Sequence, residues 1–159
     1  MGYYYLDTCV DDFNEDEALK WFLKAIEQGC EESELYFYLG YSYYIRNDDS
    51  EAIKWYLKSA EKGNVDAEKE LGDIFYFCTG NSDEACKWYK RAFEHGRTSG
   101  LRNLGDIYSK RYKDGGRNEQ DYNEAMKWYI KDAAYHIDES ITQERIQELI
   151  DEKYKDNIL

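Results

Sequence analysis

The chain has 159 residues, a formal net charge of -13, 17 tyrosines and no proline. A chain of this length can bury a substantial core, and the absence of proline favours long helices, because proline removes an amide donor and clashes inside a helix. No apolar run reaches the roughly 18 residues of a membrane-spanning helix and no signal peptide is visible, so we expect a cytoplasmic protein with no membrane partner. The excess of acids disfavours nucleic acid as a partner, because phosphates repel an acidic surface.

Basic side chains are concentrated in one part of the chain. Residues 85–117, called the basic segment below, hold nine Lys and Arg but three Asp and Glu. The segment therefore carries a net charge of +6, and the rest of the chain carries -19. Such asymmetry indicates a partner with an acidic feature. The alternative is that these bases are scattered over solvated helix surfaces, and the sequence leaves both interpretations open.

A six-residue pattern, Glu-Ala-x-Lys-Trp followed by Phe or Tyr, occurs four times. The copies begin at Glu17, Glu51, Glu84 and Glu124, and all four tryptophans of the chain occupy the fifth position. The copies are 34, 33 and 40 residues apart, and a period in this range is typical of stacked helix pairs. We expect each copy to form one helix of such a pair.

The ends of these helices carry recognisable signals. Each copy follows a residue whose side-chain oxygen can cap a helix N-terminus. These residues are Asp16, Ser50, Asp83 and Asn123. Three copies end at a glycine that can adopt the left-handed conformation closing a helix, namely Gly29, Gly63 and Gly96. The fourth copy has His136 at that place, so we expect a different exit.

A second helix between the copies carries a Leu-Gly-x-x-aromatic pattern. Its glycines are Gly40, Gly72 and Gly105. A glycine inside a helix costs about 1 kcal/mol relative to alanine, so close approach of the neighbouring helix is the expected reason for it. We expect this face to pack on the Ala-x-x-Trp-Tyr face of its partner helix, with Trp55 filling the space between two helices.

Together these helices resemble the Sel-one-like repeat, a branch of the tetratricopeptide superfamily. The resemblance implies an all-α, right-handed α-solenoid of stacked antiparallel helix pairs. We expect one repeat domain over residues 1–159, with a partial first repeat and a final capping helix. Its parts are residues 1–29, 33–63, 66–96 and 98–136 for the repeats and 140–154 for the cap. The apolar face of the cap comprises Ile141, Ile146, Leu149, Ile150 and Tyr154.

The resemblance also implies where a partner binds. In tetratricopeptide solenoids the first helix of each pair lines a concave groove, at positions three before, one after and four after the glycine. The candidate groove residues are Phe37, Tyr41, Tyr44, Lys69, Asp73, Tyr76, Arg102, Asp106 and Ser109, and the partial first copy adds Tyr3 and Leu6. The Lys and Asn or Arg pairs of the family's carboxylate clamp are missing here, so recognition of chaperone tails is not supported.

The aromatic groove positions on the first complete pair have two interpretations. Phe37, Tyr41 and Tyr44 fall outside the core pattern of Leu35 and Leu39. Tyrosine offers a large contact area and a hydroxyl, which suits binding hot spots. The alternative is that some of these rings pack against the neighbouring repeat.

The chain shows no motif for catalysis or metal binding. His95 and His136 stand at helix ends, where the helix dipole favours a cation, and no third residue is placed to orient either as a base. The cysteines Cys9, Cys30, Cys78 and Cys86 lack the spacing of a zinc knuckle. A Cys78–Cys86 disulfide is conceivable, but free thiols fit a reducing compartment better. We therefore expect no enzyme, no catalytic residue, no metal and no cofactor.

The sequence thus predicts a non-catalytic protein–protein interaction module, an adaptor or scaffold. The expected partner is another protein with an acidic or aromatic-binding segment. One alternative is a small acidic inhibitor or immunity-type protein that masks a toxin or an enzyme. Another is a nucleic-acid binder that uses the basic segment, with Tyr108 and Tyr112 available to stack on bases.

Overall fold

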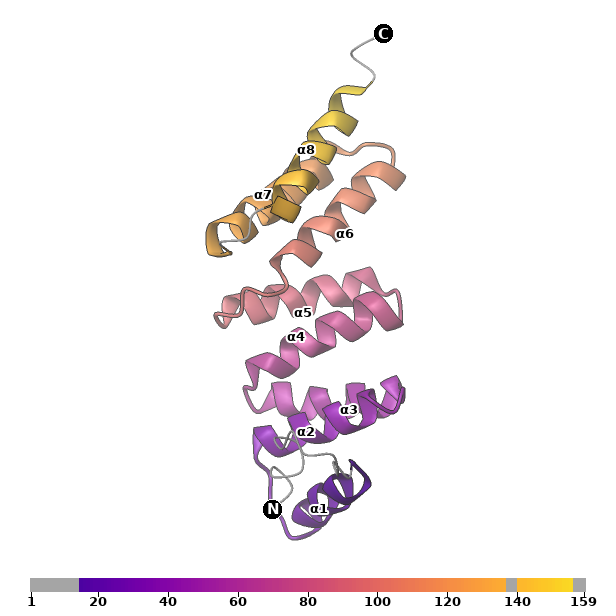
Figure 1. The fold of residues 1–159 in the computed structure, drawn as a ribbon, viewed down its shortest axis with the longest axis vertical. Helices are drawn as coiled ribbons and strands as arrows, with labels where there is room; N and C mark the ends of the chain where they lie inside the picture. The colour runs from indigo at the N-terminus through magenta and orange to yellow at the C-terminus, as the bar shows by residue number, and fades with distance from the viewer. Residues whose placement is uncertain (1–14, 137–139, 156–159) are drawn as a thin grey trace. The chain divides into compact units, whose positions relative to one another are not determined.

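The computed structural model describes residues 15–136 and 140–155, and every regular element in them is helical (Figure 1). The predicted all-α class is therefore confirmed. The chain divides into two compact units, residues 1–80 (unit 1) and residues 81–159 (unit 2), and each is described by itself. The single domain and the right-handed superhelix stay predictions, and Tyr3, Leu6 and Cys9 lie outside the described residues.

In the described part of unit 1, residues 15–80, four α-helices follow one another along the chain. These are α1 (Glu15–Glu27), α2 (Ser33–Tyr44), α3 (Asp49–Glu61) and α4 (Val65–Asp73), and α4 continues as one π-helical turn, η2 (Ile74–Cys78). Each helix packs on the next in the chain, and α2 with α3 forms the most extensive pair of the unit (Figure 1). The pair joins a Leu-Gly helix to a Glu-Ala helix, as the sequence predicts.

Unit 2 contains α5 (Ser82–Glu94), α6 (Leu101–Asp114), α7 (Glu119–Tyr135) and α8 (Ser140–Tyr154). Its most extensive pair, α6 with α7, again joins a Leu-Gly helix to a Glu-Ala helix, and α8 packs on both. The α7 helix begins five residues before the repeated Glu124. Part of the longer spacing before this copy is therefore helical.

The helices begin earlier than predicted. Asp48 caps α3 by accepting a hydrogen bond from the amide of Glu51 at 3.2 Å, and Asn81 does the same for α5. Asn118 caps α7. The predicted caps were wrong because Ser50, Asp83 and Asn123 are preceded by other Asp and Asn residues that can also cap, and the outermost position adds helical hydrogen bonds.

The predicted helix exits are confirmed. Gly29, Gly63 and Gly96 have φ of 86°, 88° and 96°, which is the left-handed conformation that closes a helix. His136 has an extended backbone with φ of -118°, and its ring lies beside Asp132 one turn earlier. The fourth copy therefore leaves its helix by a different route.

Close contact between a glycine and a tyrosine ring holds both helix pairs together. A methyl group placed on Gly40 of α2 would lie 2.7 Å from the Tyr56 ring of α3, well inside van der Waals contact. A methyl group on Gly105 of α6 would overlap the Tyr129 ring of α7 in the same way. The predicted reason for these two glycines is thereby confirmed. The ring fills the space that a side chain on the facing helix would otherwise take.

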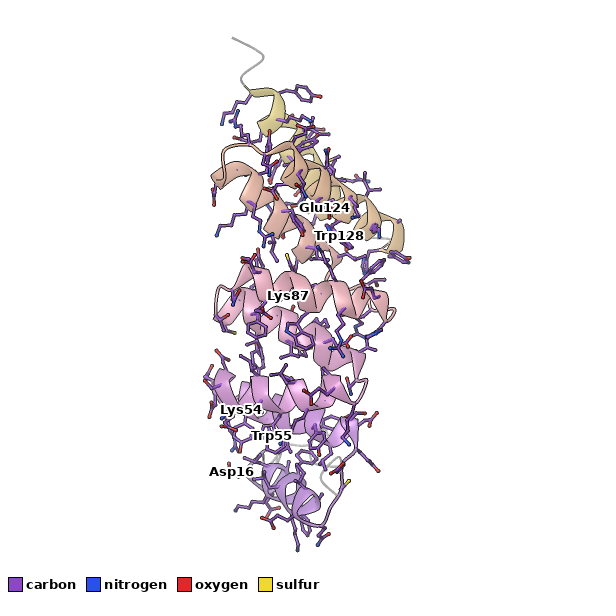
Figure 2. All side chains as sticks on the ribbon, turned by 180° about the vertical axis from the view of Figure 1, so that it is seen from behind. Asp16, Lys54, Trp55, Lys87, Glu124 and Trp128 are labelled. Atoms are coloured by element: carbon purple, nitrogen blue, oxygen red, sulfur yellow. The ribbon has the colours of Figure 1, made fainter. Side chains whose placement is uncertain are left out.

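Tyr56, and not Trp55, lies against the glycine of the facing helix, which corrects the expectation. Ala52, Tyr56 and Ala60 recur every four residues on one face of α3, and each is 0% exposed. Trp55, labelled in Figure 2, is one position away from this stripe; it is half-buried and packs at the edge of the core cluster that contains Leu35 and Leu39. The ammonium of Lys58 lies 4.2 Å from the centre of its ring. The tyrosine therefore fills the space between the helices, and the tryptophan shields it beneath a cation.

The C-terminal helix α8 packs on unit 2 with the central part of its predicted face. Leu149 is 0% exposed and packs in a cluster with Tyr112 and Tyr129, and Ile146 packs against the same cluster. The two end residues of the predicted face, Ile141 and Tyr154, are 49% and 50% exposed, contrary to expectation. Thr142 points inward instead of Ile141, because it bonds a buried carboxylate.

We predict that Gly40→Ala destabilises the protein by about 1–3 kcal/mol, because overlap with the Tyr56 ring outweighs the gain in helix propensity. Urea unfolding of a double-mutant cycle checks the cause. In a Tyr56→Leu background the added methyl has room, so the cost of Gly40→Ala should largely disappear. An equal cost in both backgrounds would show that the ring contact is not the reason for this glycine.

We also predict that Leu149→Ala costs about 2–5 kcal/mol of unfolding free energy, since it opens a cavity under α8. Ile141→Ala on the same helix removes an exposed side chain and should stay within about 0.5 kcal/mol of the parent. Chemical denaturation measures both. Similar losses for the two variants would mean that α8 does not pack as described.

Candidate functional site

Two tyrosines of α2 are exposed at the predicted groove positions of unit 1. Tyr41 and Tyr44 are 42% and 38% exposed and lie three residues apart, on one helix face. Phe37 is half-buried instead, and its ring lies 5.5 Å from the Tyr56 ring and 5.7 Å from the Tyr38 ring. Packing within the repeat accounts for Phe37 but leaves Tyr41 and Tyr44 at the surface.

The predicted groove cation of unit 1 is already paired. The ammonium of Lys69 lies 2.6 Å from the Asp73 carboxylate and 3.2 Å from that of Glu70. Burial lowers the pKa of Lys69, but its bonds to these two carboxylates outweigh burial and raise that pKa above its ordinary value. Tyr76, half-buried on η2, makes an edge contact with Phe77 at 4.7 Å.

Acidic side chains of α3 and α4 act on Tyr44 of α2. Burial, and after it the charges of Cys78, Glu70, Asp49 and Asp73, raises the pKa of Tyr44 above its ordinary value. Three of these four groups are carboxylates. Asp73 is one of the predicted groove residues, whereas Glu70 and Asp49 come from outside the counted groove positions.

The tyrosine that fills each helix pair has a different hydroxyl environment in the two units. In unit 2 the Tyr129 hydroxyl donates to the Asp106 carboxylate at 2.7 Å. Asp106 directly follows the glycine of its helix, and the matching residue of α2 is Tyr41, which has no carboxylate. The Tyr56 hydroxyl is buried and has no hydrogen-bond partner within the described part of the chain. Burial, then the charge of Glu70, raises the pKa of Tyr56 well above its ordinary value, so the group is a neutral phenol.

The predicted groove residues of unit 2 have partners on α7 and α8. The Arg102 guanidinium lies 3.4 Å from Asp132 of α7, and Asp106 lies 3.6 Å from Arg145 of α8. Asp132 is 2% exposed and also accepts a 2.6 Å hydrogen bond from Thr142 of α8. The helix α8 thus engages the same positions that a partner was expected to use.

Several bases of the basic segment also have partners inside unit 2. Lys90 donates to the Tyr108 hydroxyl at 2.8 Å, and Arg111 pairs with Asp83 at 2.6 Å. Tyr112 is 3% exposed. It is therefore not available to stack on a nucleic-acid base, which corrects the expectation from the sequence.

The repeated Glu, Lys and Trp positions form a local polar network on the helix surface. Lys127 pairs with Glu124 at 2.9 Å, and the indole N–H of Trp128 donates to the same carboxylate at 3.0 Å (Figure 2). The corresponding Glu51 and Lys54 pair in α3. The pattern that identified the repeat thus serves helix stability and leaves the binding surface to other positions.

Among the described residues, no group of three His, Cys, Asp or Glu side chains is placed to hold a metal ion. None of the described helices combines the length and the apolar character that crossing a membrane requires. Cys30, Cys78 and Cys86 are free thiols. A hollow of about 450 Å³ in unit 2 has Lys110 and Arg111 in its lining, which contains no His or Cys.

Comparisons with known proteins bear on what this arrangement is. The family model of the Sel1 repeat matches residues 1–30, 33–64, 66–96 and 98–131. A search of curated proteins finds no match. Among solved structures, MamA has a TM-score of 0.67 at 19% identity, over 84% of this chain and 72% of its own, which shows the fold alone.

Two solved Sel1-type structures are closer in sequence. A Sel1 repeat protein from Oxalobacter formigenes is 30% identical over 96% of this chain, with a TM-score of 0.67. A protective antigen of uropathogenic Escherichia coli strains, with an SLR fold, is 31% identical over 84% of this chain, with a TM-score of 0.62. This chain spans 60% and 29% of their lengths. Since the four repeat matches cover well over half of the chain, it belongs to the Sel1 repeat family of all-α solenoids.

Proposed function

We propose that this chain is a non-catalytic adaptor or scaffold that binds a segment of another protein on the exposed face of α2 in unit 1. Sel1 repeats generally bind other proteins. This general property of the family indicates the class of function. The binding face has to be identified from the residues of this chain. Of the predicted groove positions, those on α2 offer exposed aromatic surface.

The observation that carries the proposal is the exposure of Tyr41 and Tyr44 beside a tightly packed helix pair. Two large rings on one helix face, 42% and 38% exposed, bring contact area at a low cost in conformational entropy. The underlying α2–α3 pair is held by the contact of Gly40 with Tyr56, so the rings stand on a fixed support. Rigidly supported tyrosines are typical of binding hot spots.

The matching positions of unit 2 support this choice by contrast. Arg102 and Asp106 are engaged by Asp132 and Arg145, so a partner would have to displace existing bonds there. Displacing a paired charge leaves its former partner unsatisfied, which opposes binding. The α2 face carries no such penalty at Tyr41 or Tyr44.

We predict that Tyr41→Ala with Tyr44→Ala abolishes capture of the natural partner while the protein stays folded. Truncating aromatic anchors costs at least about 2 kcal/mol of binding, which is roughly a 30-fold loss of affinity. The partner is first identified by affinity capture from native lysate and mass spectrometry. Purified partner is then titrated against each variant by calorimetry.

The control is Tyr135→Ala with Tyr154→Ala, which removes two exposed tyrosines of unit 2. This variant should bind the partner as the parent does, and circular dichroism should give helix content and thermal midpoints close to the parent for both double variants. If the α2 variant is folded and binds with unchanged affinity, the binding face lies elsewhere and the proposal is wrong.

A further inference from the structure

The surroundings of Tyr44 contain more acidic than basic side chains among the described residues. Asp49, Glu70 and Asp73 act on Tyr44, and Lys69 pairs with Glu70 and Asp73. The three carboxylates and this ammonium sum to a formal charge of -2 at pH 7. A partner group that docks beside Tyr44 therefore meets an excess of acid.

Several aromatic rings of the described residues have a Lys or Arg over the ring face, whereas Tyr41 and Tyr44 do not. All four tryptophans carry a Lys or Arg over the ring, for example Lys24 over Trp21 at 5.0 Å and Arg91 over Trp88 at 5.2 Å. No cation of the described residues lies over Tyr41 or Tyr44. Exposed tyrosine faces beside carboxylates are the surroundings in which a cation binds best.

In unit 2, a cation lies beside the residue that matches Tyr41. There the Arg145 guanidinium of α8 lies 3.6 Å from Asp106, the carboxylate that accepts the hydrogen bond of the Tyr129 hydroxyl. The positive charge of Arg145 also acts on Tyr129. One cation thus already occupies a surface built of a glycine helix, a crossing tyrosine and a carboxylate.

We propose that the tyrosine–acid face of unit 1, formed by Tyr41, Tyr44, Glu70 and Asp73, receives a Lys or Arg side chain of the partner protein. This inference rests on the proposed function, because it names the chemistry of the partner that binds there. The cation stacks on the exposed rings and pairs with the partly exposed carboxylates. It takes the part that Arg145 plays in unit 2.

The acidic partner expected from the sequence fits this face less well. That expectation came from the basic segment, which lies in unit 2, and the one predicted groove cation of unit 1, Lys69, is held by Asp73 and Glu70. A partner carboxylate would approach three carboxylates and would have to break one of those ion pairs. A partner cation needs no such exchange.

The test uses the full chain and four capped pentapeptides, each with two glycines on either side of Arg, Lys, Glu or norleucine. Each peptide is titrated by two-dimensional amide NMR at low ionic strength, where exposed charge pairs are least screened. The Arg and Lys peptides should shift amides of α2 and α4, with the Arg peptide binding more tightly. The Glu and norleucine peptides should leave these amides unchanged.

Acid variants separate a specific site from general attraction to an acidic protein. Glu70→Gln with Asp73→Asn should weaken the Arg peptide about tenfold. Glu27→Gln with Glu61→Gln removes the same charge from exposed C-terminal residues of α1 and α3, and should change its affinity less than about twofold. Equal weakening by both variants, or equal binding of the Glu peptide, would overturn the proposal.

Ring variants test the part of the exposed tyrosines and stay informative if the acid variant unfolds. Tyr41→Leu with Tyr44→Leu keeps apolar side chains but removes the aromatic faces, so Arg-peptide affinity should fall about three- to tenfold. Tyr135→Leu with Tyr154→Leu changes two exposed tyrosines of unit 2 in the same way and should leave the affinity unchanged. Unchanged affinity in the α2 variant would overturn the rings as the cation site.

These outcomes are distinct from failure of the proposed function. If the Tyr41 and Tyr44 double variant loses the natural partner but the Arg peptide does not bind, the face binds proteins through some other group, and only this inference fails. If the Arg peptide binds as expected but the double variant keeps the natural partner, the proposed docking face fails.

Discussion

Gly40 and Gly105 have no side chain, and the rings of Tyr56 and Tyr129 lie directly against their backbones. Each contact lets two helices approach until one aromatic ring fills the space between them. Even a methyl group would have to displace the ring, so this approach depends on glycine. The same crossing carries the hydroxyl beyond the glycine to the next residue of the helix, and it therefore links the packing of the core to the chemistry of the surface.

The residue after the glycine determines whether that hydroxyl has a hydrogen-bond partner. Asp106 accepts the hydroxyl of Tyr129 in unit 2, whereas Tyr41 leaves the hydroxyl of Tyr56 unpaired in unit 1. Leaving a buried polar group unpaired costs about 1–3 kcal/mol. Native proteins carry few such groups, and those that persist are expected at functional sites. The unpaired Tyr56 hydroxyl belongs to the same helix pair as the two exposed rings of Tyr41 and Tyr44. The face of α2, and not the matching surface around Asp106, therefore supports the binding proposal.

The sequence predicted the parts of the fold that repeat, and it failed where neighbouring residues offer the same chemistry. Spacing fixed the helix pairs, the glycine contacts and the left-handed exits. It could not choose between Asp48 and Ser50 as caps, or decide which of Trp55 and Tyr56 points inward, because each pair consists of nearby residues of similar kind. Nor could it show that Arg102 meets Asp132, since 30 residues separate them. The candidate groove residues could therefore be predicted from spacing, while the pairing of their charges needed the structure.

The surface of the glycine helix is covered in unit 2 and exposed in unit 1, and the capping helix makes this difference. A repeat array has to cover its last apolar face, and in unit 2 α8 does so with Leu149 while Arg145 reaches Asp106. In unit 2 one helix thus covers the core and also contacts a groove position, because the apolar face and the groove positions lie on the same pair of helices. On α2 the core is covered by neighbouring helices, and Tyr41 and Tyr44 remain exposed. A partner segment that brings a cation to them would reproduce on unit 1 the contacts that the chain already makes with itself on unit 2.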